Sequence, residues 1–398
     1  MKVLFFAPYI YDKNHEEFSV SSSGFGYMVN DILCEVSKIQ KVALITHKFT
    51  SGYTDNYRAI RHTKTDVLFN MKPKDFLNGV KVALTAKDSL IYKLRYAYYY
   101  INVGCVRNAI QKFKPDVIHI HGLTMQTKPI IELCEELDCK YVVTLHGLIG
   151  VHDIVSASNE NKKFEHSGLK FLEKKQRVIT VVSSGVKKHI QEDYHLKGDN
   201  INVVLNGITL PKEFERKTEN KKKYLMCVGS ISKRKNQIQL IRVIDLMSDE
   251  ERKNIEVHIV GSPSSELDIL SEINKRHLEN VITFHGFIPR EEISSMWKKA
   301  DLNVIMSRSE GFGLSIIEGY SYGVPCVAFD DIDAVIDLYD SESMTLINEY
   351  SDDAALQGIR EALSRKWNRN TIIKISKRFS LQTICDEYVR IYNRVVGR

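Results

Sequence analysis

Two carboxylates with a glycine turn between them could bind a ligand that carries both phosphates and hydroxyls. Seven residues separate Glu310 from Glu318, and an apolar, helix-spaced run follows the turn, so the turn is expected to open a helix. Glycines let a backbone come close to a ligand, and the first N–H groups of a helix, aided by its dipole, bind phosphate oxygens. The residues expected to hold a diphosphate in this way are Gly311, Phe312, Gly313 and Leu314.

The two glutamates are then expected to contact hydroxyl groups. Glu318 lies one turn inside the expected helix and would accept hydrogen bonds from vicinal hydroxyls such as those of a ribose. Glu310 lies just before the turn and would reach a second hydroxylated group. The pattern therefore predicts a sugar nucleotide as the ligand.

Spacing alone would not support this prediction. Glu165 and Glu173 are separated by the same number of residues, but no glycine turn follows Glu165 and no strand pattern follows Glu173. Around the turn at 311–313, by contrast, a strand pattern at 302–306 precedes the first glutamate and another at 326–329 follows the helix. The order of strand, turn, helix and strand is what makes a nucleotide site the favoured interpretation.

The segment SRSEGFGLSIIEGYSYGVPCVA, residues 307–328, resembles the signature of the retaining family-4 glycosyltransferases (glycosyl transferases group 1). The resemblance extends over nearly the whole chain. It implies the GT-B architecture, an α/β fold with two Rossmann-like, doubly wound parallel-sheet domains facing across a cleft and a C-terminal helix that crosses back to the first domain. It also implies that Glu310 binds hydroxyls of the donor sugar and takes part in catalysis.

Two cations near the start of the second domain are candidates for the donor diphosphate. Arg234 and Lys235 precede a helical pattern at 237–247, where positive charge would meet a diphosphate held by backbone groups. The loop resembles the family's phosphate-binding loop, with Lys235 at the position of its lysine. The arginine often found directly after the loop glycine is Ser230 here, so neutralisation is expected to depend on Arg234 and Lys235. The alternative is an ordinary solvated basic loop.

Further strand patterns at 224–228, 256–260 and 281–284 alternate with helical patterns at 266–277 and 290–299, which predicts a doubly wound sheet. The loop after the third of these strands is expected to offer backbone groups to the nucleotide base. Its candidate residues are Gly286, Phe287 and Ile288.

The first half of the chain shows strand patterns at 3–7, 42–46, 116–121, 141–145, 178–182 and 201–205. His146 follows one of these strands, at the edge where open α/β sheets place ligands. In the family, a histidine in such a position points into the active cleft near the transferred sugar, so His146 is a candidate catalytic residue. His119 alternates with isoleucines inside a strand and is expected to be structural.

A dinucleotide-binding motif is rejected. Gly24 and Gly26 fit the first two places of G-x-G-x-x-G, but the third falls on Val29 and the glycines lie far beyond the first strand. The family resemblance implies instead that Gly24 and Gly26 belong to a loop facing the cleft, before a helix from Tyr27 to Ser37.

A length of 398 residues predicts two domains. We expect an acceptor-side domain of residues 1–208 with a crossing helix of residues 377–398, and a nucleotide-sugar-binding domain of residues 209–376.

The seven scattered cysteines indicate a reducing compartment. The apolar start has no cleavage site and no run approaches the roughly 20 apolar residues that span a bilayer, so we expect a cytoplasmic protein that at most contacts the cytoplasmic face of the membrane.

A basic stretch at 72–114 suggests such a contact. It carries nine basic and two acidic residues, with Tyr92, Tyr96, Tyr98, Tyr99 and Tyr100 interleaved. Lysine, arginine and interfacial aromatic rings suit anionic lipid headgroups. A solvated basic helix with tyrosines in the core is the alternative, and an RNA surface would look similar, although no nucleic-acid partner is expected.

The chemistry expected from these features needs no cofactor and no metal, with the nucleotide diphosphate sugar as substrate. No D-x-D pair precedes a nucleotide fold, and Asp331 and Asp333 follow the signature instead.

Membership in the family implies retention of anomeric configuration by front-face substitution. We expect transfer of a hexose or N-acetylhexosamine, with UDP favoured over GDP on family frequency, to a saccharide or lipid-linked acceptor in cell-surface polysaccharide synthesis. The alternatives are a sugar-nucleotide epimerase of the same architecture and a non-enzymatic lipid- or nucleic-acid-binding module.

Overall fold

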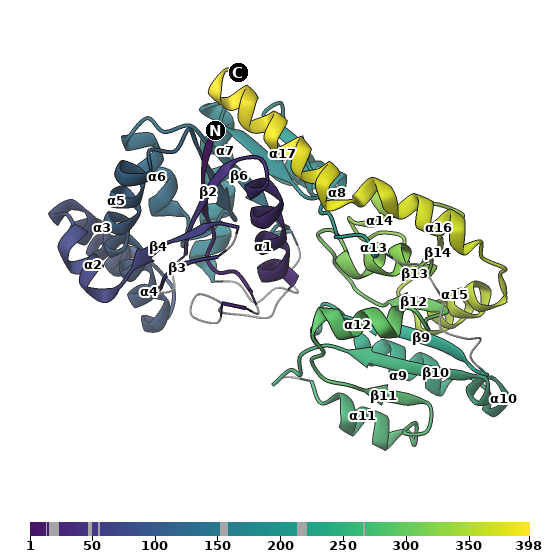
Figure 1. Cartoon of the computed structure of the whole chain (residues 1–398). Helices are drawn as coiled ribbons and strands as arrows, with labels where there is room; N and C mark the ends of the chain where they lie inside the picture. Colours follow the sequence, from purple (N-terminus) through teal and green to yellow (C-terminus); the bar gives the residue numbers. More distant parts are fainter. Residues whose placement is uncertain are drawn as a thin grey trace. The chain divides into compact units, whose positions relative to one another are not determined.

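The computed structural model describes residues 1–12, 14–15, 24–46, 50–54, 56–151, 158–212, 221–265 and 267–398. The chain divides into two compact units (Figure 1). Unit 1 comprises Met1–Gly207 and Leu381–Arg398, and unit 2 comprises Ile208–Ser380. The chain therefore leaves unit 1 once and returns to it for its last helix, and both crossings lie within a few residues of the predicted boundaries.

Unit 1 is built on an eight-stranded sheet of order β3-β4-β2-β1-β5-β6-β7-β8. Neighbouring strands are parallel except β3 and β4, which are antiparallel at one edge. The central strands are almost wholly buried, as expected of a parallel sheet covered on both faces. The strands are β1 (Lys2–Phe6), β2 (Lys41–Ile45), β3 (Thr50–Tyr53), β4 (Arg58–His62), β5 (Val117–His121), β6 (Tyr141–Leu145), β7 (Val178–Val181) and β8 (Ile201–Val203).

The last helix, α17 (Leu381–Val396), packs on α1 and on strands β5 and β6 of unit 1. It buries Ile384, Tyr388 and Tyr392. The other helices of this unit are α1 (Gly24–Ser37), α2 (Lys64–Asn70), α3 (Pro73–Thr85), α4 (Leu90–Ile101), α5 (Val103–Phe113), α6 (Lys128–Glu136), α7 (Asn159–Lys174) and α8 (Ser184–Glu192).

The prediction that Gly24 and Gly26 form a loop is wrong, because α1 already begins at Gly24. Glycine is among the residues accepted at helix starts, so these two glycines do not prevent α1 from beginning there. The carbonyl of Gly26 accepts a hydrogen bond from the N–H of Tyr11 at 3.1 Å. The predicted serine-containing part of the loop, residues 21–23, lies outside the described residues.

Unit 2 contains a six-stranded, wholly parallel sheet of order β11-β10-β9-β12-β13-β14. The two parallel-sheet, Rossmann-like folds confirm the predicted fold class, apart from the antiparallel edge strand of unit 1. The strands are β9 (Lys223–Val228), β10 (Ile255–Val260), β11 (Ile282–Phe284), β12 (Leu302–Ile305), β13 (Cys326–Phe329) and β14 (Met344–Ile347). The helices are α9 (Gln237–Asp245), α10 (Asp249–Lys253), α11 (Ile269–Lys275), α12 (Arg290–Trp297), α13 (Leu314–Ser321), α14 (Val335–Leu338), α15 (Asp352–Ser364) and α16 (Arg369–Ser376), followed by the short 3₁₀ helix η1 (Lys377–Phe379).

All seven cysteines are unpaired, and five of them are buried. Among the helices of the described ranges, none is both long enough and apolar enough to cross a membrane.

Candidate functional site

Glu310 is the centre of a charged cluster in unit 2. It lies in the loop between β12 and α13 and is only 5% exposed. Its carboxylate forms an ion pair with Lys235 and contacts Arg234, whose Nη1 lies 3.5 Å from Oε2. The hydroxyl of Ser307 donates to Oε1 at 2.6 Å. Two of the residues predicted for the diphosphate therefore meet the predicted catalytic carboxylate in one place.

The charges of this cluster fix the ionisation of Glu310. Burial by itself would raise the pKa of this carboxyl, because water no longer stabilises its charge. The neighbouring Lys235 and Arg234 and the hydrogen bonds from Lys235 and Ser307 outweigh burial and hold the pKa of Glu310 below its ordinary value. Glu310 is therefore a carboxylate at neutral pH.

The loop between β9 and α9 places the two cations. The side-chain amide of Gln237, which is 1% exposed, donates from Nε2 to the carbonyls of Gly229 and Ser230 at 3.1 Å each. Arg234 is fixed further by its Nη1, which donates to the carbonyl of Ser309 at 2.6 Å. Gln237 was not singled out from the sequence, since a glutamine in the first turn of a helix carries no distinctive pattern. Ser230, at the place of the family's arginine, is exposed.

Close packing of two strand ends explains one glycine of this region. A Cβ on Gly261, just after β10, would lie 1.9 Å from the carbonyl oxygen of Gly229, just after β9. The backbones therefore touch directly, and any larger residue at 261 would displace the backbone at Gly229 and Ser230, in the loop that carries the cations. The structure thus gives Gly261 a packing role in positioning the cations.

The glycine turn does open a helix. Gly313 is the N-cap of α13 with φ 81°, a left-handed conformation that favours glycine. The side chain of Phe312 is buried and lies edge-on to Phe379, with ring centroids 6.1 Å apart. Phe312 can therefore offer only its backbone to a ligand, as Gly311 and Leu314 can with theirs at the positive end of the helix dipole.

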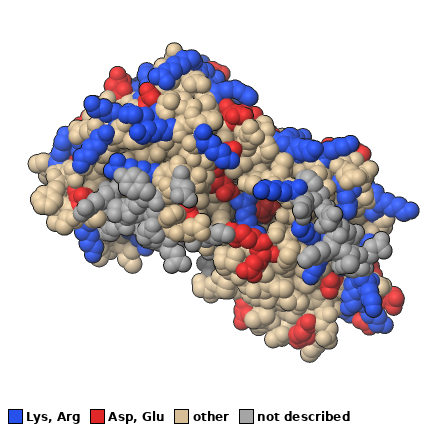
Figure 2. Space-filling view, viewed as in Figure 1, with Lys and Arg blue, Asp and Glu red and all other residues tan. Residues whose placement is uncertain are grey.

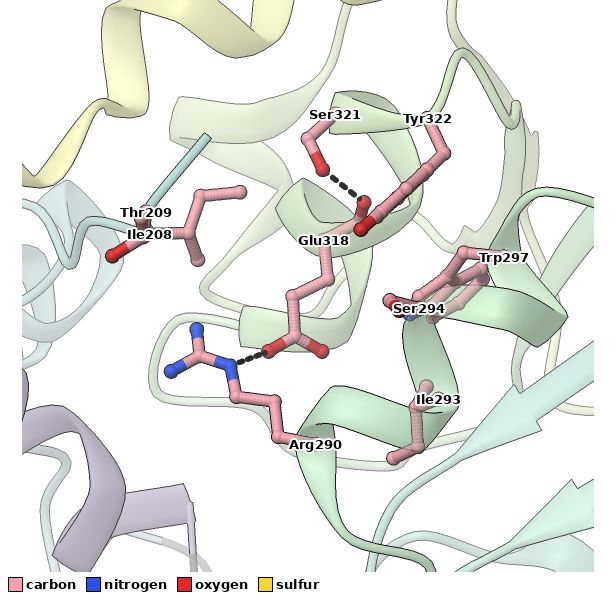
Figure 3. A pocket seen from close by; sticks show the side chains of 9 residues that line it. All are labelled: Ile208, Thr209, Arg290, Ile293, Ser294, Trp297, Glu318, Ser321 and Tyr322. Carbon is pink, nitrogen blue, oxygen red and sulfur yellow. Dashed lines mark hydrogen bonds and ion pairs between the residues drawn. The ribbon is translucent and has the colours of Figure 1, made fainter. Parts of the chain in front are cut away.

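Glu318 lies beside a small hollow of about 60 Å³ in unit 2. Figure 3 shows its carboxylate pointing from α13 toward Arg290 of α12, whose Nε lies 3.1 Å from Oε1. The indole of Trp297 and the hydroxyl of Ser294 line the same hollow. Arg290 was not predicted as a site residue, because its approach to Glu318 depends on how two helices pack.

The predicted base-binding loop leads directly into Arg290. Gly286 has φ 68°, and its carbonyl accepts a hydrogen bond from the N–H of Gly261 at 2.8 Å. The Phe287 side chain is 40% exposed, whereas Ile288 packs on the cluster that contains Trp297. Residues 286–288 and Glu318 are therefore connected through Arg290 and α12.

His146, which follows β6, belongs to a group of three histidines in unit 1, with His119 and His121 of β5. Its Nε2 lies 3.0 Å from Nδ1 of His121, and the two rings are stacked. His119 contacts the hydroxyls of Thr144 and Tyr392 at 2.6 Å each and has the structural role expected of it. Burial lowers the pKa of His146 to about 3, and the pKa values of His119 and His121 are lowered as well. All three are neutral at physiological pH.

One ring nitrogen of His146 is buried and unpartnered among the described residues. Within the described parts of the chain, Nδ1 of His146 is buried and has no hydrogen-bond partner, and the same holds for Nε2 of His121. A neutral imidazole with such a nitrogen can donate or accept a hydrogen bond but does not act as a cation. The ring of Phe25 packs edge-on against His146 at 4.9 Å.

Glu165, set aside in the sequence as a chance spacing match, holds the loop that follows His146. It is 1% exposed and accepts hydrogen bonds from the N–H groups of Ile149 and Gly150 at 2.7 and 2.9 Å and from the hydroxyl of Tyr194. Burial raises the pKa of Glu165 despite these hydrogen bonds. Only its contacts in the folded chain reveal this role.

Comparison with protein families covers most of the chain. The family model for glycosyl transferases group 1 matches residues 211–379, and the model for glycosyltransferase family 4 matches residues 61–211. The chain belongs to the family-4, group 1 glycosyltransferases. The boundary between the two matches lies at the boundary between units 1 and 2.

Two curated relatives show how far the similarity of this glycosyltransferase extends. An uncharacterized 41.2 kDa protein in the cps region of Klebsiella pneumoniae is 24% identical over 70% of this chain and 79% of its own length. The O-antigen chain mannosyltransferase B of Escherichia coli is 27% identical over 37% of this chain, and the alignment spans only 43% of that relative.

Solved structures confirm the fold of the glycosyltransferase. Sucrose-phosphate synthase from Thermosynechococcus elongatus superposes with a TM-score of 0.73 at 15% identity, covering 100% of this chain and 99% of the other. HepE of Anabaena in complex with UDP superposes with a TM-score of 0.65 at 15% identity, covering 99% and 100%. Because both matched families are glycosyltransferases, neither the epimerase nor the non-enzymatic binding module is favoured.

Proposed function

We propose that this glycosyltransferase moves a hexose or N-acetylhexosamine from a nucleotide diphosphate sugar to a saccharide or lipid-linked acceptor. The observation that carries the proposal is the cluster in unit 2, where Lys235 and Arg234 meet Glu310 beside the start of α13. The cluster supplies two cations for a leaving diphosphate and one carboxylate for sugar hydroxyls.

Stabilisation of the leaving group is the main task of the site. As the bond between the sugar and the diphosphate breaks, negative charge develops on phosphate oxygens, and positioned cations and N–H groups stabilise that charge. Lys235, Arg234 and the first N–H groups of α13 are suited to this role. We therefore propose a reaction that needs no divalent metal and no cofactor.

Glu310 changes partner during the proposed reaction. Without a donor its carboxylate neutralises Lys235 and Arg234. A bound diphosphate would bring its own negative charge to these cations, so that Glu310 could turn to the hydroxyls of the transferred sugar. Glu318 would meanwhile accept hydrogen bonds from the ribose, with Arg290 as its neighbour, and Gly286, Phe287 and Ile288 would contact the base.

Retention of anomeric configuration is proposed through front-face substitution, in which an oxygen of the leaving phosphate helps to remove the acceptor proton. His146 is neutral because burial lowers its pKa to about 3, so we assign it hydrogen bonding to the sugar instead of charge stabilisation. The buried, unpartnered Nδ1 of His146 in the described structure supports this assignment. Gly24 and Gly26, in the first turn of α1, are proposed to contribute backbone groups nearby.

The donor and the pathway are proposed from the relatives. The complex of HepE with UDP supports UDP as the donor nucleotide. The relatives from a cps region and from O-antigen synthesis support an acceptor in cell-surface polysaccharide assembly. A reaction on such an acceptor would take place in the cytoplasm or at the cytoplasmic face of the membrane.

A two-step experiment tests the proposal. Nucleotide sugars are first screened for a rise in melting temperature, because a ligand that binds only the native state stabilises it. The best donor is then incubated with lipid-linked and free saccharides in the presence and absence of EDTA, and the anomeric configuration of the product is read by NMR. Activity abolished by EDTA, an inverted product, or conversion of donor without acceptor would each contradict a part of the proposal.

A further inference from the structure

An apolar surface on the outside of unit 1 is unlike that of an ordinary solvated helix pair. Helix α3 exposes Phe76, Leu77, Val80 and Leu84, which share one side of the helix, and Leu84 is 78% exposed. The opposite side packs on α4, where a Cβ on Gly79 would lie 3.0 Å from the carbonyl oxygen of Ala97. The exposed side of α3 therefore does not contribute to the core.

Helices α2 and α4 extend this surface. Helix α4 exposes Leu90, Ile91 and Leu94, and α2 exposes Leu68 and Phe69, the latter to 87%. Together with α3 these helices carry nine of the seventeen large apolar side chains that are exposed in the described part of the chain. We call the exposed apolar and basic residues of 64–95 the α2–α4 face. Single exposed apolar residues are normal, but a concentration of this size indicates a binding surface.

The three aspartates of this stretch are buried or partly buried, and each is paired or hydrogen-bonded. Asp75 is 3% exposed and forms an ion pair with Arg107, whose Nη1 lies 2.8 Å from Oδ2. Asp66 accepts from the backbone N–H of Thr63 at 2.9 Å, as part of the cap of α2. Asp88 accepts from the hydroxyl of Tyr96 at 2.6 Å and from the backbone N–H of Asn159. No glutamate occurs between residues 64 and 95.

The basic residues of these helices are mostly exposed. Six cations of residues 64–95 lie in exposed positions, whereas none of the three aspartates does. Figure 2 shows the result at the end of unit 1 where α2, α3 and α4 lie in Figure 1: tan and blue spheres intermingle with little red. The exposed cations are Lys64, Lys72, Lys74, Lys81, Lys87 and Arg95.

Three of the five tyrosines of this stretch do not belong to the surface. Tyr96, Tyr99 and Tyr100 are buried, and the hydroxyl of Tyr100 donates to Glu132 Oε2 at 3.0 Å. The expectation that interleaved tyrosines provide interfacial rings is therefore wrong for these three residues, because α4 turns them toward the core. Leucine, isoleucine and phenylalanine occupy the outer side instead.

We propose that the α2–α4 face binds the surface of a bilayer that contains anionic lipids. Exposed apolar side chains insert at the boundary between headgroups and acyl chains, and a surrounding ring of lysine and arginine binds anionic headgroups. Asp75 is buried, and Asp66 and Asp88 are partly buried and hydrogen-bonded, so exposed positive charge predominates on this face and complements an anionic membrane. The proposal deepens the proposed function, since it brings unit 1 to the membrane where a lipid-linked acceptor resides.

Vesicle flotation tests this proposal without any substrate. The full chain is mixed with vesicles of phosphatidylcholine or of phosphatidylcholine and phosphatidylglycerol at a ratio of about 7:3, and the fraction of protein that floats is measured. We expect flotation with the anionic vesicles, weakened by added salt because surface charges are screened. The triple variant Leu77→Gln, Leu84→Gln, Leu94→Gln is expected to partition at least about tenfold more weakly, as is Lys72→Glu, Lys81→Glu, Lys87→Glu.

Matched controls come from unit 2. The variant Leu246→Gln, Leu270→Gln, Ile336→Gln also changes exposed large apolar residues, at 51%, 54% and 57%, and is expected to float like the unchanged protein. A lysine control is Lys222→Glu, Lys275→Glu, Lys366→Glu, all at exposed positions. Equal melting temperatures and equal nucleotide binding would show that all variants are folded.

Three results would overturn the proposal. The first is that the unchanged protein does not float with anionic vesicles. The second is that the variants of the α2–α4 face float as well as the controls. The third is that the face joins two copies of the chain. The last result would appear in sedimentation as a dimer that the leucine variant converts to a monomer, without vesicle binding. Because flotation needs no donor, failure here leaves the proposed glycosyl transfer untouched, and failure to transfer sugar leaves this test valid.

Discussion

Lys235 and Glu310, 75 residues apart in the chain, form an ion pair in unit 2. Glu310 is almost fully buried, so its charge depends on Lys235 and Arg234 for compensation. Removing one partner of a buried pair leaves an uncompensated charge, which costs more than the pair contributes as a whole. The pair therefore links the geometry of the site to its stability, and each of its members can be tested separately.

Replacement of Glu310 by glutamine should slow sugar transfer by about 100-fold or more, because the amide keeps the size of the side chain but removes the charge that orients hydroxyls and cations. The turnover number is measured at saturating donor and acceptor. Glu361→Gln, at an exposed position on α15, is the control and should be fully active. Undiminished turnover of the Glu310→Gln variant would remove this carboxylate from the reaction.

The variant Lys235→Met should bind the nucleoside diphosphate about 10- to 100-fold more weakly, since a charge-assisted contact to a phosphate oxygen is lost. Calorimetric titration with the nucleoside diphosphate and with the corresponding nucleoside separates the loss of a phosphate contact from a disturbance of the whole pocket. The nucleoside has no phosphates, so its affinity should not change. An equal loss for both ligands would mean that the variant disturbs the whole pocket and that Lys235 does not contact the diphosphate.

The ribose contact of Glu318 can be measured with a deoxy ligand. The unchanged protein should bind a nucleoside diphosphate about tenfold more tightly than its 2′-deoxy analogue, because a hydroxyl donates to the carboxylate. The variant Glu318→Ala should bind the two ligands alike. If the variant still prefers the ribose form, another residue reads the hydroxyl.

Ser230 offers a gain-of-affinity test. It is exposed next to Gly229, at the place where relatives often have an arginine. The variant Ser230→Arg should bind the nucleoside diphosphate about tenfold more tightly through an added charge-assisted contact, whereas Ser230→Ala should be unchanged. Titration calorimetry measures the affinity of each variant. Unchanged or weakened binding by Ser230→Arg would place position 230 away from the diphosphate.

The three histidines of unit 1 should make stability depend on pH. Burial depresses their pKa values in the folded protein, to about 3 for His119 and His146, while the unfolded chain has ordinary values near 6.5. Below pH 6.5 the unfolded state therefore binds protons that the folded state does not. The stabilisation is complete above pH 6.5 and is lost as the pH falls toward 3, at up to about 1.4 kcal/mol per pH unit for each histidine.

Chemical denaturation at pH 7 and pH 5 measures this dependence. The variant His121→Gln cannot take up the proton and should show a smaller loss of unfolding free energy between the two pH values. The comparison uses the difference between the two pH values, so a uniform destabilisation by the substitution does not affect it. An identical difference in both proteins would show that His121 is not one of the groups responsible.

Predictions from short stretches agreed best with the structure. The helix after the glycine turn begins at Leu314 and the following strand covers Cys326–Phe329, as the sequence indicated. Apolar period and turn residues act over a few positions and can be read without the rest of the chain. The strands β3 and β4 were not predicted, because TSGY and RAIRH have no continuous apolar run and pair only at the sheet edge.

The sequence by itself determined the family, the two parallel-sheet units and the candidate residues around Glu310, since these depend on local periodicity and on a signature within 22 residues. Only the tertiary structure decided which distant residues meet. Arg290 reaches Glu318, Glu165 holds the loop after His146, and Asp75 of α3 is buried against Arg107. Such contacts depend on how helices and strands pack, a relation that no pattern along the chain contains.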